Sequence, residues 1–316
     1  MPSSPEPNIT GTNQGTGPDH FGVISKIQRY STRDGPGIRT TVFCAGCNLR
    51  CIWCANPELF TGDTQILYYR NRCVRCGACT ARSRGTIIIG PEGCEIDRIH
   101  CNNLAECAAA CNHEAYESSG HSITPVELTR KLLRDKAFYD QSGGGITFSG
   151  GEPALQPEFI AETAALLRNA GVHTALDTAG NAEWESLETM AENMDLILFD
   201  IKAFDDEIHK NCTGVSNSLI LENAERFARW NKVLWIRLIF APPFNDGTDW
   251  EKRLDFVNFL GKAVNRIDLL PLHKLGAGKY CALDMPDPLE GVPECSPEAV
   301  AEALRIAECK GLTLII

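Results

Sequence analysis

The chain has 316 residues, 43% of them hydrophobic, and a formal net charge of -11, which argues against a nucleic-acid partner because such proteins normally present a clustered basic face. It has neither the basic start and apolar stretch of a signal peptide nor a segment long enough to cross a membrane. Its fifteen cysteines are an odd number grouped at metal-ligand spacing, so we expect a reduced, cytoplasmic protein with no membrane partner.

Strand-like and helix-like segments alternate along most of the chain. Residues 1–20 are rich in Pro, Ser, Thr and Gly, and we expect a disordered tail there. Strands are predicted at 37–43, 145–149, 173–177, 195–202, 233–240 and 266–272, and helices at 125–139, 157–170, 218–230, 248–262 and 297–310. Six such βα repeats predict an α/β protein with a parallel sheet and right-handed crossovers.

A cysteine run follows the first predicted strand directly. Cys47, Cys51 and Cys54 have the spacing C-x3-C-x2-C. Thiolates are soft ligands suited to a 4Fe-4S cluster, and three of them leave one of its four irons without a protein ligand. An open coordination position is where a bound metal performs chemistry. The alternative is a zinc loop that takes its fourth ligand from elsewhere.

This spacing resembles that of the radical S-adenosylmethionine superfamily. Flanking segments resemble the activating enzymes of glycyl radical enzymes: DGPGIR at 34–39, WCANPE at 53–58, TFSGGEP at 147–153, LDT at 176–178, FDIK at 199–202 and LPLHKLG at 270–276. The resemblance implies a partial (β/α)6 barrel formed by residues 21–65 and 116–316. Reactive residues of a parallel barrel gather at the carboxyl ends of its strands, where these motifs fall.

The resemblance also implies the ligands of the site. A 4Fe-4S cluster would be held by Cys47, Cys51 and Cys54, with S-adenosylmethionine on its open iron. The expected contacts to that cofactor are Trp53, Cys54, Ala55, Ser149, Gly150, Gly151, Glu152, Asp177, Thr178, Asp200, Lys202 and His273. Asp177, Thr178 and Asp200 also match a position for a monovalent cation. Arg237 could pair with a carboxylate or lie along the barrel wall, and Cys44 is expected to be a packing residue.

Residues 66–115 interrupt the barrel and resemble a ferredoxin-like iron-sulfur insertion. Two-cluster ferredoxins have two C-x2-C-x2-C-x3-C runs, and the fourth cysteine of each run ligates the other run's cluster. Crossed ligation here gives one complete set, Cys73, Cys76, Cys79 and Cys111. The other set keeps only Cys101 and Cys107, because Ser83 and Leu104 fill its remaining places; Cys94 could rebuild it, with His100 or His113 as poorer substitutes. The alternative is an insertion that is empty or binds zinc.

Together these features predict an enzyme that reductively cleaves S-adenosylmethionine to a 5'-deoxyadenosyl radical. The radical would take a hydrogen atom from a backbone glycine of a partner glycyl radical enzyme. Flavodoxin or ferredoxin is the expected electron donor, at least one auxiliary 4Fe-4S cluster is expected, and the chain is expected to be a monomer. Two alternatives are a radical enzyme that acts on a small molecule or peptide, and a ferredoxin-type electron carrier. The sequence does not identify which glycyl radical enzyme is the partner.

Overall fold

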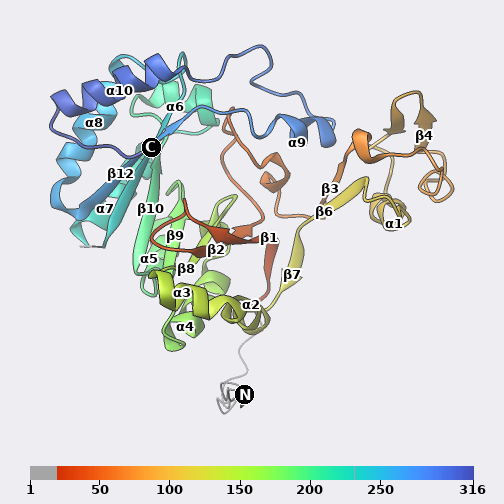
Figure 1. Cartoon of the computed structure of the whole chain (residues 1–316), viewed down its shortest axis with the longest axis horizontal. Coiled ribbons are helices and arrows are strands. Elements are labelled where there is room, and N and C mark those ends of the chain that lie inside the picture. The colour runs from red at the N-terminus through yellow and green to blue at the C-terminus, as the bar shows by residue number, and fades with distance from the viewer. Residues whose placement is uncertain (1–19, 231) are drawn as a thin grey trace.

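A computed structural model describes residues 20–230 and 232–316 of the chain (Figure 1). The predicted tail therefore lies, except for its last residue, outside the described residues. No helix within the described ranges is both long enough and apolar enough to span a membrane.

The central sheet contains the six predicted parallel strands in chain order. They are β2 (Arg39–Cys44), β8 (Gly145–Gly150), β9 (His173–Thr178), β10 (Leu196–Ile201), β11 (Leu234–Phe240) and β12 (Val264–Pro271). The strand order is β12-β11-β10-β9-β8-β2-β1-β7, and every pair from β2 to β12 is parallel. The predicted α/β class is confirmed, and the carboxyl ends of the six strands meet at one rim.

Two antiparallel strands extend this sheet beyond β2, and we did not predict them. β1 (Gly22–Ser31) pairs with β2, and β7 (His121–Ile123) pairs with β1. The register between β1 and β2 shifts twice, which marks bulges that interrupt the alternation of buried and exposed residues. The period of two by which a strand is recognised in sequence is therefore lost in β1.

Helices cover the sheet at each predicted position, and three of them, α5, α6 and α9, were not predicted (Figure 1). They are α2 (Pro125–Leu132), α3 (Lys136–Ser142), α4 (Pro157–Asn169), α5 (Trp184–Ala191), α6 (Asp206–Thr213), α7 (Ser218–Arg229), α8 (Thr248–Leu260), α9 (Ala277–Ala282) and α10 (Pro297–Cys309), with 3-10 turns at Pro57–Leu59, Arg70–Arg72, Leu133–Asp135, Pro153–Leu155 and Gly261–Ala263. The single helix predicted at 125–139 is wrong. A 3-10 turn divides it at Asp135, whose buried carboxylate pairs with Arg29 at 3.0 Å and accepts a hydrogen bond from Thr40.

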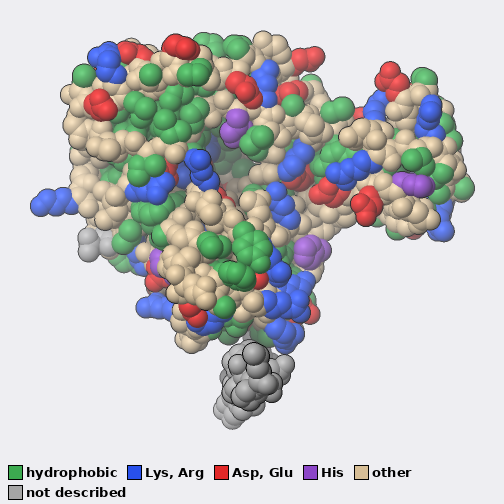
Figure 2. All heavy atoms as spheres, in the orientation of Figure 1, with side chains coloured by type: hydrophobic (Ala, Val, Ile, Leu, Met, Phe, Trp, Pro, Cys, Tyr) green, Lys and Arg blue, Asp and Glu red, His purple; other side chains and the backbone are tan. Residues whose placement is uncertain are grey.

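Residues 65–119, between β2 and β8, project from the side of the barrel, and Figure 2 shows a narrow waist between the two parts. An antiparallel ribbon of β3 (Gln65–Tyr68) and β6 (Tyr116–Ser119) forms its base. Beyond the ribbon lie the hairpin of β4 (Ile87–Gly90) and β5 (Gly93–Ile96), and the short helix α1 (Leu104–Ala109). This segment has its own small core, which includes Tyr68, Ile87 and several cysteines.

Candidate active site

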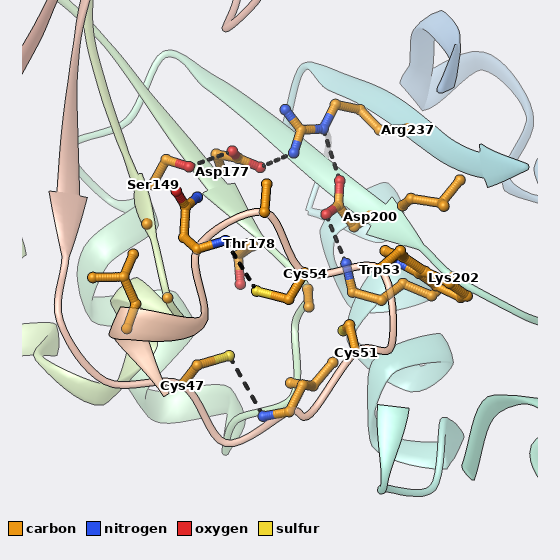
Figure 3. Close-up of a pocket in the computed structure, with 18 of the residues that line it drawn as sticks. Cys47, Cys51, Trp53, Cys54, Ser149, Asp177, Thr178, Asp200, Lys202 and Arg237 are labelled. Carbon is orange, nitrogen blue, oxygen red and sulfur yellow. Dashed lines mark hydrogen bonds and ion pairs between the residues drawn. The ribbon is translucent and has the colours of Figure 1, made fainter. Parts of the chain in front are cut away.

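A cavity of about 240 Å³ opens at the carboxyl rim of the parallel strands (Figure 3). The three cysteines of the C-x3-C-x2-C run line one side, and charged residues from β9, β10 and β11 line the other. Every predicted cofactor contact except Glu152 lines this cavity: Trp53, Cys54, Ala55, Ser149, Gly150, Gly151, Asp177, Thr178, Asp200, Lys202 and His273. The structure therefore brings together motifs that are spread over more than two hundred residues of sequence.

The loop after β2 presents the three thiols. Backbone N–H groups of Leu49 and Asn56 donate to the sulfurs of Cys47 and Cys54 at 3.5 and 3.4 Å (Figure 3). Burial raises the pKa of Cys47 and Cys54 to about 11 and that of Cys51 to about 12. These groups are thiols at neutral pH, and binding a metal would have to displace their protons.

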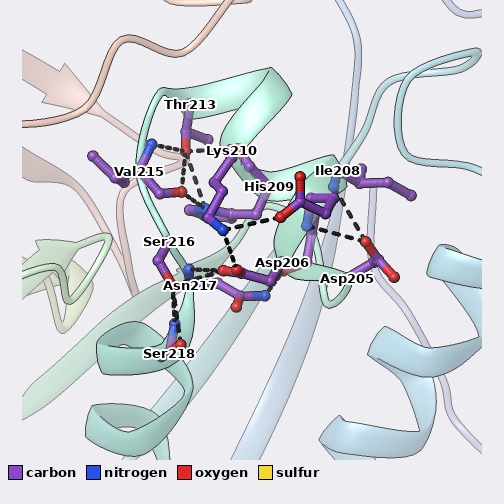
Figure 4. Close-up of polar contacts among 12 residues, drawn as sticks. Asp205, Asp206, Ile208, His209, Lys210, Thr213, Val215, Ser216, Asn217 and Ser218 are labelled. Atoms are coloured by element: carbon purple, nitrogen blue, oxygen red, sulfur yellow. Dashed lines mark hydrogen bonds and ion pairs between the residues drawn. The ribbon is translucent and has the colours of Figure 1, made fainter.

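Helix α6 holds the middle of the cysteine loop. The N–H of Arg50 donates to the carbonyl of Thr213, the last residue of α6, at 2.7 Å. The helix end is itself fixed, because His209 and Thr213 both contact the carbonyl of Val215 (Figure 4). Asp205 caps the start of the helix by accepting from two backbone N–H groups. A capped helix thus supports the loop on which a cluster would be built.

Arg237 lies between two buried carboxylates on the opposite side of the cavity. Its Nη2 is 2.7 Å from Asp177 Oδ1, and its Nε is 2.7 Å from Asp200 Oδ1. Lys202 Nζ lies 2.9 Å from the other oxygen of Asp200, and Ser149 donates to Asp177 at 2.6 Å. Of the two interpretations of Arg237, carboxylate pairing is therefore the one that the structure shows.

The two aspartates differ in their ionisation. Burial raises the pKa of Asp177 to about 7, although Arg237 acts in the opposite direction. Burial also acts upward on Asp200, but Arg237 and Lys202 together outweigh it and lower the pKa of Asp200 to about 2. The two cations therefore hold Asp200 as an anion, whereas burial shifts Asp177 toward its protonated form.

Glu152 does not line the cavity, unlike Ser149, Gly150 and Gly151, which precede it. Its fully buried carboxylate accepts hydrogen bonds from Thr178 Oγ1 at 2.6 Å, from the N–H of Ala179 at 2.9 Å and from the N–H of Ala154 at 3.1 Å. Burial raises the pKa of this carboxyl, and these hydrogen bonds oppose the rise. Because Thr178 and Ala179 both line the cavity, Glu152 fixes part of the cavity wall from behind.

Gly150 and Gly151 let the backbone approach the cysteine loop closely. Gly150 has a φ of 119°, and a Cβ there would lie 2.3 Å from the backbone nitrogen of Cys44. A Cβ on Gly151 would lie 2.0 Å from the carbonyl oxygen of Gly46. Any side chain at these positions would push the end of β8 away from the cysteine loop. Cys44 itself is fully buried in the main core, as predicted for a packing residue.

Comparison with known proteins identifies the family. The family model described as the Radical SAM superfamily matches residues 41–260 of this chain. The chain belongs to the radical SAM superfamily. Its relatives include the (2S)-3-sulfopropanediol dehydratase activating enzyme of Klebsiella oxytoca, 37% identical over 86% of this chain and 88% of the relative. The benzylsuccinate synthase activating enzyme of Thauera aromatica is 35% identical over 93% of this chain and 92% of the relative.

A further relative agrees with this placement in the radical SAM superfamily. The 4-hydroxyphenylacetate decarboxylase activating enzyme of Clostridioides difficile is 36% identical over 83% of this chain and 85% of the relative. A solved domain of pyruvate-formate lyase-activating enzyme from Bacteroides vulgatus is 30% identical, covering 55% of this chain and 99% of that chain, with a TM-score of 0.47. The predicted membership of the glycyl radical enzyme activating enzymes is confirmed by the curated relatives.

Radical SAM proteins use a 4Fe-4S cluster and S-adenosylmethionine, and the donor set of this chain fits both groups. Three thiols stand on one loop, as a cluster with one open iron requires. Across the cavity, anionic and cationic side chains can receive the charged ends of a methionine moiety. Sequence reasoning missed Phe60 and Ile239 as lining residues. Ile239 lies two residues after Arg237 on β11, so alternation along the strand could have identified it.

The radical SAM chain carries a second group of cysteines in the projecting segment. Five of them line one small cavity together with His113: Cys73, Cys76, Cys79, Cys94 and Cys111. This group contains the complete set predicted from crossed ligation. Cys94 belongs to it, with its sulfur 3.9 Å from that of Cys73 and 3.7 Å from that of Cys79.

The incomplete second set, Cys101 and Cys107, lies apart from Cys94, which the sequence had suggested as a further ligand for it. Cys101 and Cys107 each lie beside Asn103 Oδ1, at 3.7 and 3.8 Å, and do not line that cavity. The suggestion that Cys94 rebuilds this set does not fit the structure, because the β4–β5 hairpin directs Cys94 to the first group. Ser83, in the vacant place, donates to the carbonyls of Thr80 and Ile87 instead. His100 is exposed and paired with Asp97 at 2.7 Å.

Proposed function

We propose that this chain activates a partner glycyl radical enzyme by abstracting a hydrogen atom from a backbone glycine of that partner. The observation that carries the proposal is the single cavity in which Cys47, Cys51 and Cys54 face Asp200 and Arg237. When bound there, the cluster and S-adenosylmethionine supply reductive cleavage of the cofactor to methionine and a 5'-deoxyadenosyl radical. The relatives are named as activating enzymes of several different partners, which supports the class and leaves the individual partner open.

The chain's own residues would bind and orient the cofactor. Ser149, Gly150 and Gly151 offer backbone at the cavity edge, where carbonyl oxygens can accept hydrogen bonds from an ammonium group. Arg237 and Lys202 are cations suited to a carboxylate. Asp200 stays ionised at neutral pH and can accept hydrogen bonds from ribose hydroxyls. Trp53, Ala55 and His273, which also line the cavity, complete the proposed contacts.

A monovalent cation beside Asp177, Thr178 and Asp200 remains a prediction. Its two carboxylate ligands are already paired with Arg237 and Lys202. A bound cation would therefore have to share these oxygens with the two cationic side chains. Exchanging sodium and potassium in the buffer and measuring the affinity for S-adenosylmethionine tests whether a monovalent cation binds at this position.

The projecting segment, residues 66–115, is proposed as a ferredoxin-like domain with one auxiliary 4Fe-4S cluster. The four cysteines of crossed ligation, Cys73, Cys76, Cys79 and Cys111, line one cavity and supply a full ligand set. Cys101 and Cys107 alone cannot complete a second cluster. We propose that flavodoxin or ferredoxin delivers the electron and that the chain acts as a monomer.

Iron content and cofactor cleavage test this proposal. Anaerobic reconstitution should give roughly eight irons per chain, because each cubane holds about four. Cys51→Ala should abolish formation of 5'-deoxyadenosine, whereas Cys44→Ala, a change in the packed core beside the loop, should retain it. Cleavage that survives Cys51→Ala contradicts the cluster assignment. A chain that never cleaves the cofactor would instead be a ferredoxin-type electron carrier.

The partner is tested by electron paramagnetic resonance. Reduced chain, S-adenosylmethionine and a candidate glycyl radical enzyme are mixed without oxygen. The expected product is a protein radical whose doublet collapses when the partner's glycine is deuterated at the α-carbon. Cofactor consumption without a protein radical for every candidate partner would favour the alternative, a radical enzyme that acts on a small molecule or peptide.

A further inference from the structure

Five thiols surround a cavity where a cubane takes four. Crossed ligation assigns Cys73, Cys76, Cys79 and Cys111 to the auxiliary cluster, and each of them lines the cavity. Cys94 lines it too, although it belongs to neither cysteine run and comes from β5 of the hairpin. The role of this fifth thiol rests on the auxiliary cluster of the proposed function.

The backbone fixes Cys94 in place. Its N–H donates to the hydroxyl of Tyr68 at 2.6 Å, and its side chain is buried in the small core of the segment. From this position its sulfur contacts the sulfurs of Cys79 and Cys73 at 3.7 and 3.9 Å. These separations are hydrogen-bond distances for sulfur, and a free thiol has one hydrogen to donate.

A second donor faces the same cavity. Tyr116 lines it, and its buried hydroxyl has no hydrogen-bond partner within residues 20–230 and 232–316. The Tyr116 ring packs against that of Tyr68, with centroids 4.9 Å apart, so the hydroxyl is held at the cavity. A buried hydroxyl without a partner is costly unless an acceptor is present, and cluster sulfurs are acceptors.

We propose that Cys94 is not a ligand but a positioning residue that donates its one S–H hydrogen bond to either of the two neighbouring ligand sulfurs, those of Cys79 and Cys73, with Tyr116 as a second donor. Reduction adds one electron to the cluster and transfers no proton, so the added negative charge falls on the irons and sulfurs. Hydrogen bonds to these sulfurs stabilise the reduced state and raise the reduction potential. The auxiliary cluster is thereby easier to reduce by an external electron donor.

The test uses the full-length chain with Cys47, Cys51 and Cys54 replaced by Ala, so that only the auxiliary cluster forms. Iron is counted after anaerobic reconstitution, and the midpoint potential is measured by a dye-mediated titration followed by electron paramagnetic resonance. Cys94→Ala should keep roughly four irons and shift the potential to a more negative value. Cys94→Ser, which retains a donor, should shift it less.

Two further variants complete the comparison. Tyr116→Phe should also shift the potential to a more negative value, because it removes only the hydroxyl. Cys309→Ala, a change at an exposed cysteine at the end of α10, is the matched control and should leave iron and potential unchanged. Cys76→Ala should lose the cluster, because a non-ligating Cys94 does not replace a ligand.

Several results would overturn the proposal. Loss of iron in Cys94→Ala, or full iron in Cys76→Ala, would make Cys94 a ligand. An unchanged potential in Cys94→Ala would show that the thiol donates nothing. A triple variant that takes up no iron would remove the auxiliary cluster altogether. Because cofactor cleavage and glycyl radical formation are measured separately on the unaltered chain, that last outcome is distinguishable from failure of the activating function.

Discussion

Glu152→Gln is the substitution whose effect the structure defines most narrowly. The carboxylate accepts three hydrogen bonds from Thr178, Ala179 and Ala154 in a fully buried position. Glutamine has the same shape but carries an amide nitrogen in place of one oxygen. If this nitrogen takes the position of Oε2, it faces the N–H of Ala179, and two donors then oppose each other.

The size of the expected loss in cofactor affinity follows from this one lost hydrogen-bond acceptor. A buried donor left without a partner costs about 1–3 kcal/mol. The free protein relieves this cost by moving Thr178 and Ala179 away from the carboxamide, and cofactor binding has to return them to the cavity wall. We therefore expect the affinity for S-adenosylmethionine to fall by about 5- to 150-fold, the factor that corresponds to this free energy.

Anaerobic titration calorimetry of the reconstituted protein measures this affinity, and an iron count verifies that the cluster is intact. The matched control is Glu158→Gln, the same change on the exposed side of α4, which should bind the cofactor as the unaltered chain does. Equal affinities for Glu152→Gln and the unaltered chain, with equal unfolding midpoints, would refute the assignment of Glu152 as the residue that fixes the cavity wall.

Three other predictions concern charge. Burial raises the pKa of Asp177 from 3.8 to about 7, so the folded protein holds this proton more tightly than the unfolded chain does. The stability that this proton contributes should be lost as the pH rises from about 4 to about 7. Thermal unfolding of Asp177→Asn should lack this part of the pH dependence. Arg237→Met should cost about 3–5 kcal/mol in a denaturant titration because it leaves the buried carboxylate of Asp177 without its cationic partner, whereas an effect below 1 kcal/mol would contradict the pairing. Arg98→Ala removes contacts at 2.9 Å to Asp284 and at 2.7 Å to the carbonyl of Ala282, so hydrogen exchange in the β3–β6 ribbon should accelerate while the parallel strands keep their protection.

The sequence predicts the parallel strands because each contains a short run of apolar or β-branched residues that are buried in the sheet. β10 is an example, since Leu196–Ile201 is almost entirely buried and leads to Lys202. Helix α6 could not be predicted in the same way. It is short and mainly polar, and it depends on caps such as Asp205 and on packing against the cysteine loop.

Contacts between residues far apart in the sequence also limit how much of the site the sequence can predict. Arg237 meets Asp200 because the register of β10 and β11 places these two residues opposite each other, and no local pattern gives that register. Cys94 is the same kind of case. Its spacing suggested a replacement ligand for the incomplete set, but the turn between β4 and β5 decides which group of thiols it joins.

The β3–β6 ribbon has a consequence for how such chains can change over evolutionary time. Gln65 and Ser119 are paired across the ladder, so the polypeptide leaves the barrel and returns to it at one place. A deletion beyond the ribbon can be closed by a short turn without moving β2 or β8, and a longer segment can be grafted at the same point. The projecting segment is therefore separable from the barrel, and a gene can gain, trim or lose it while the barrel keeps its shape.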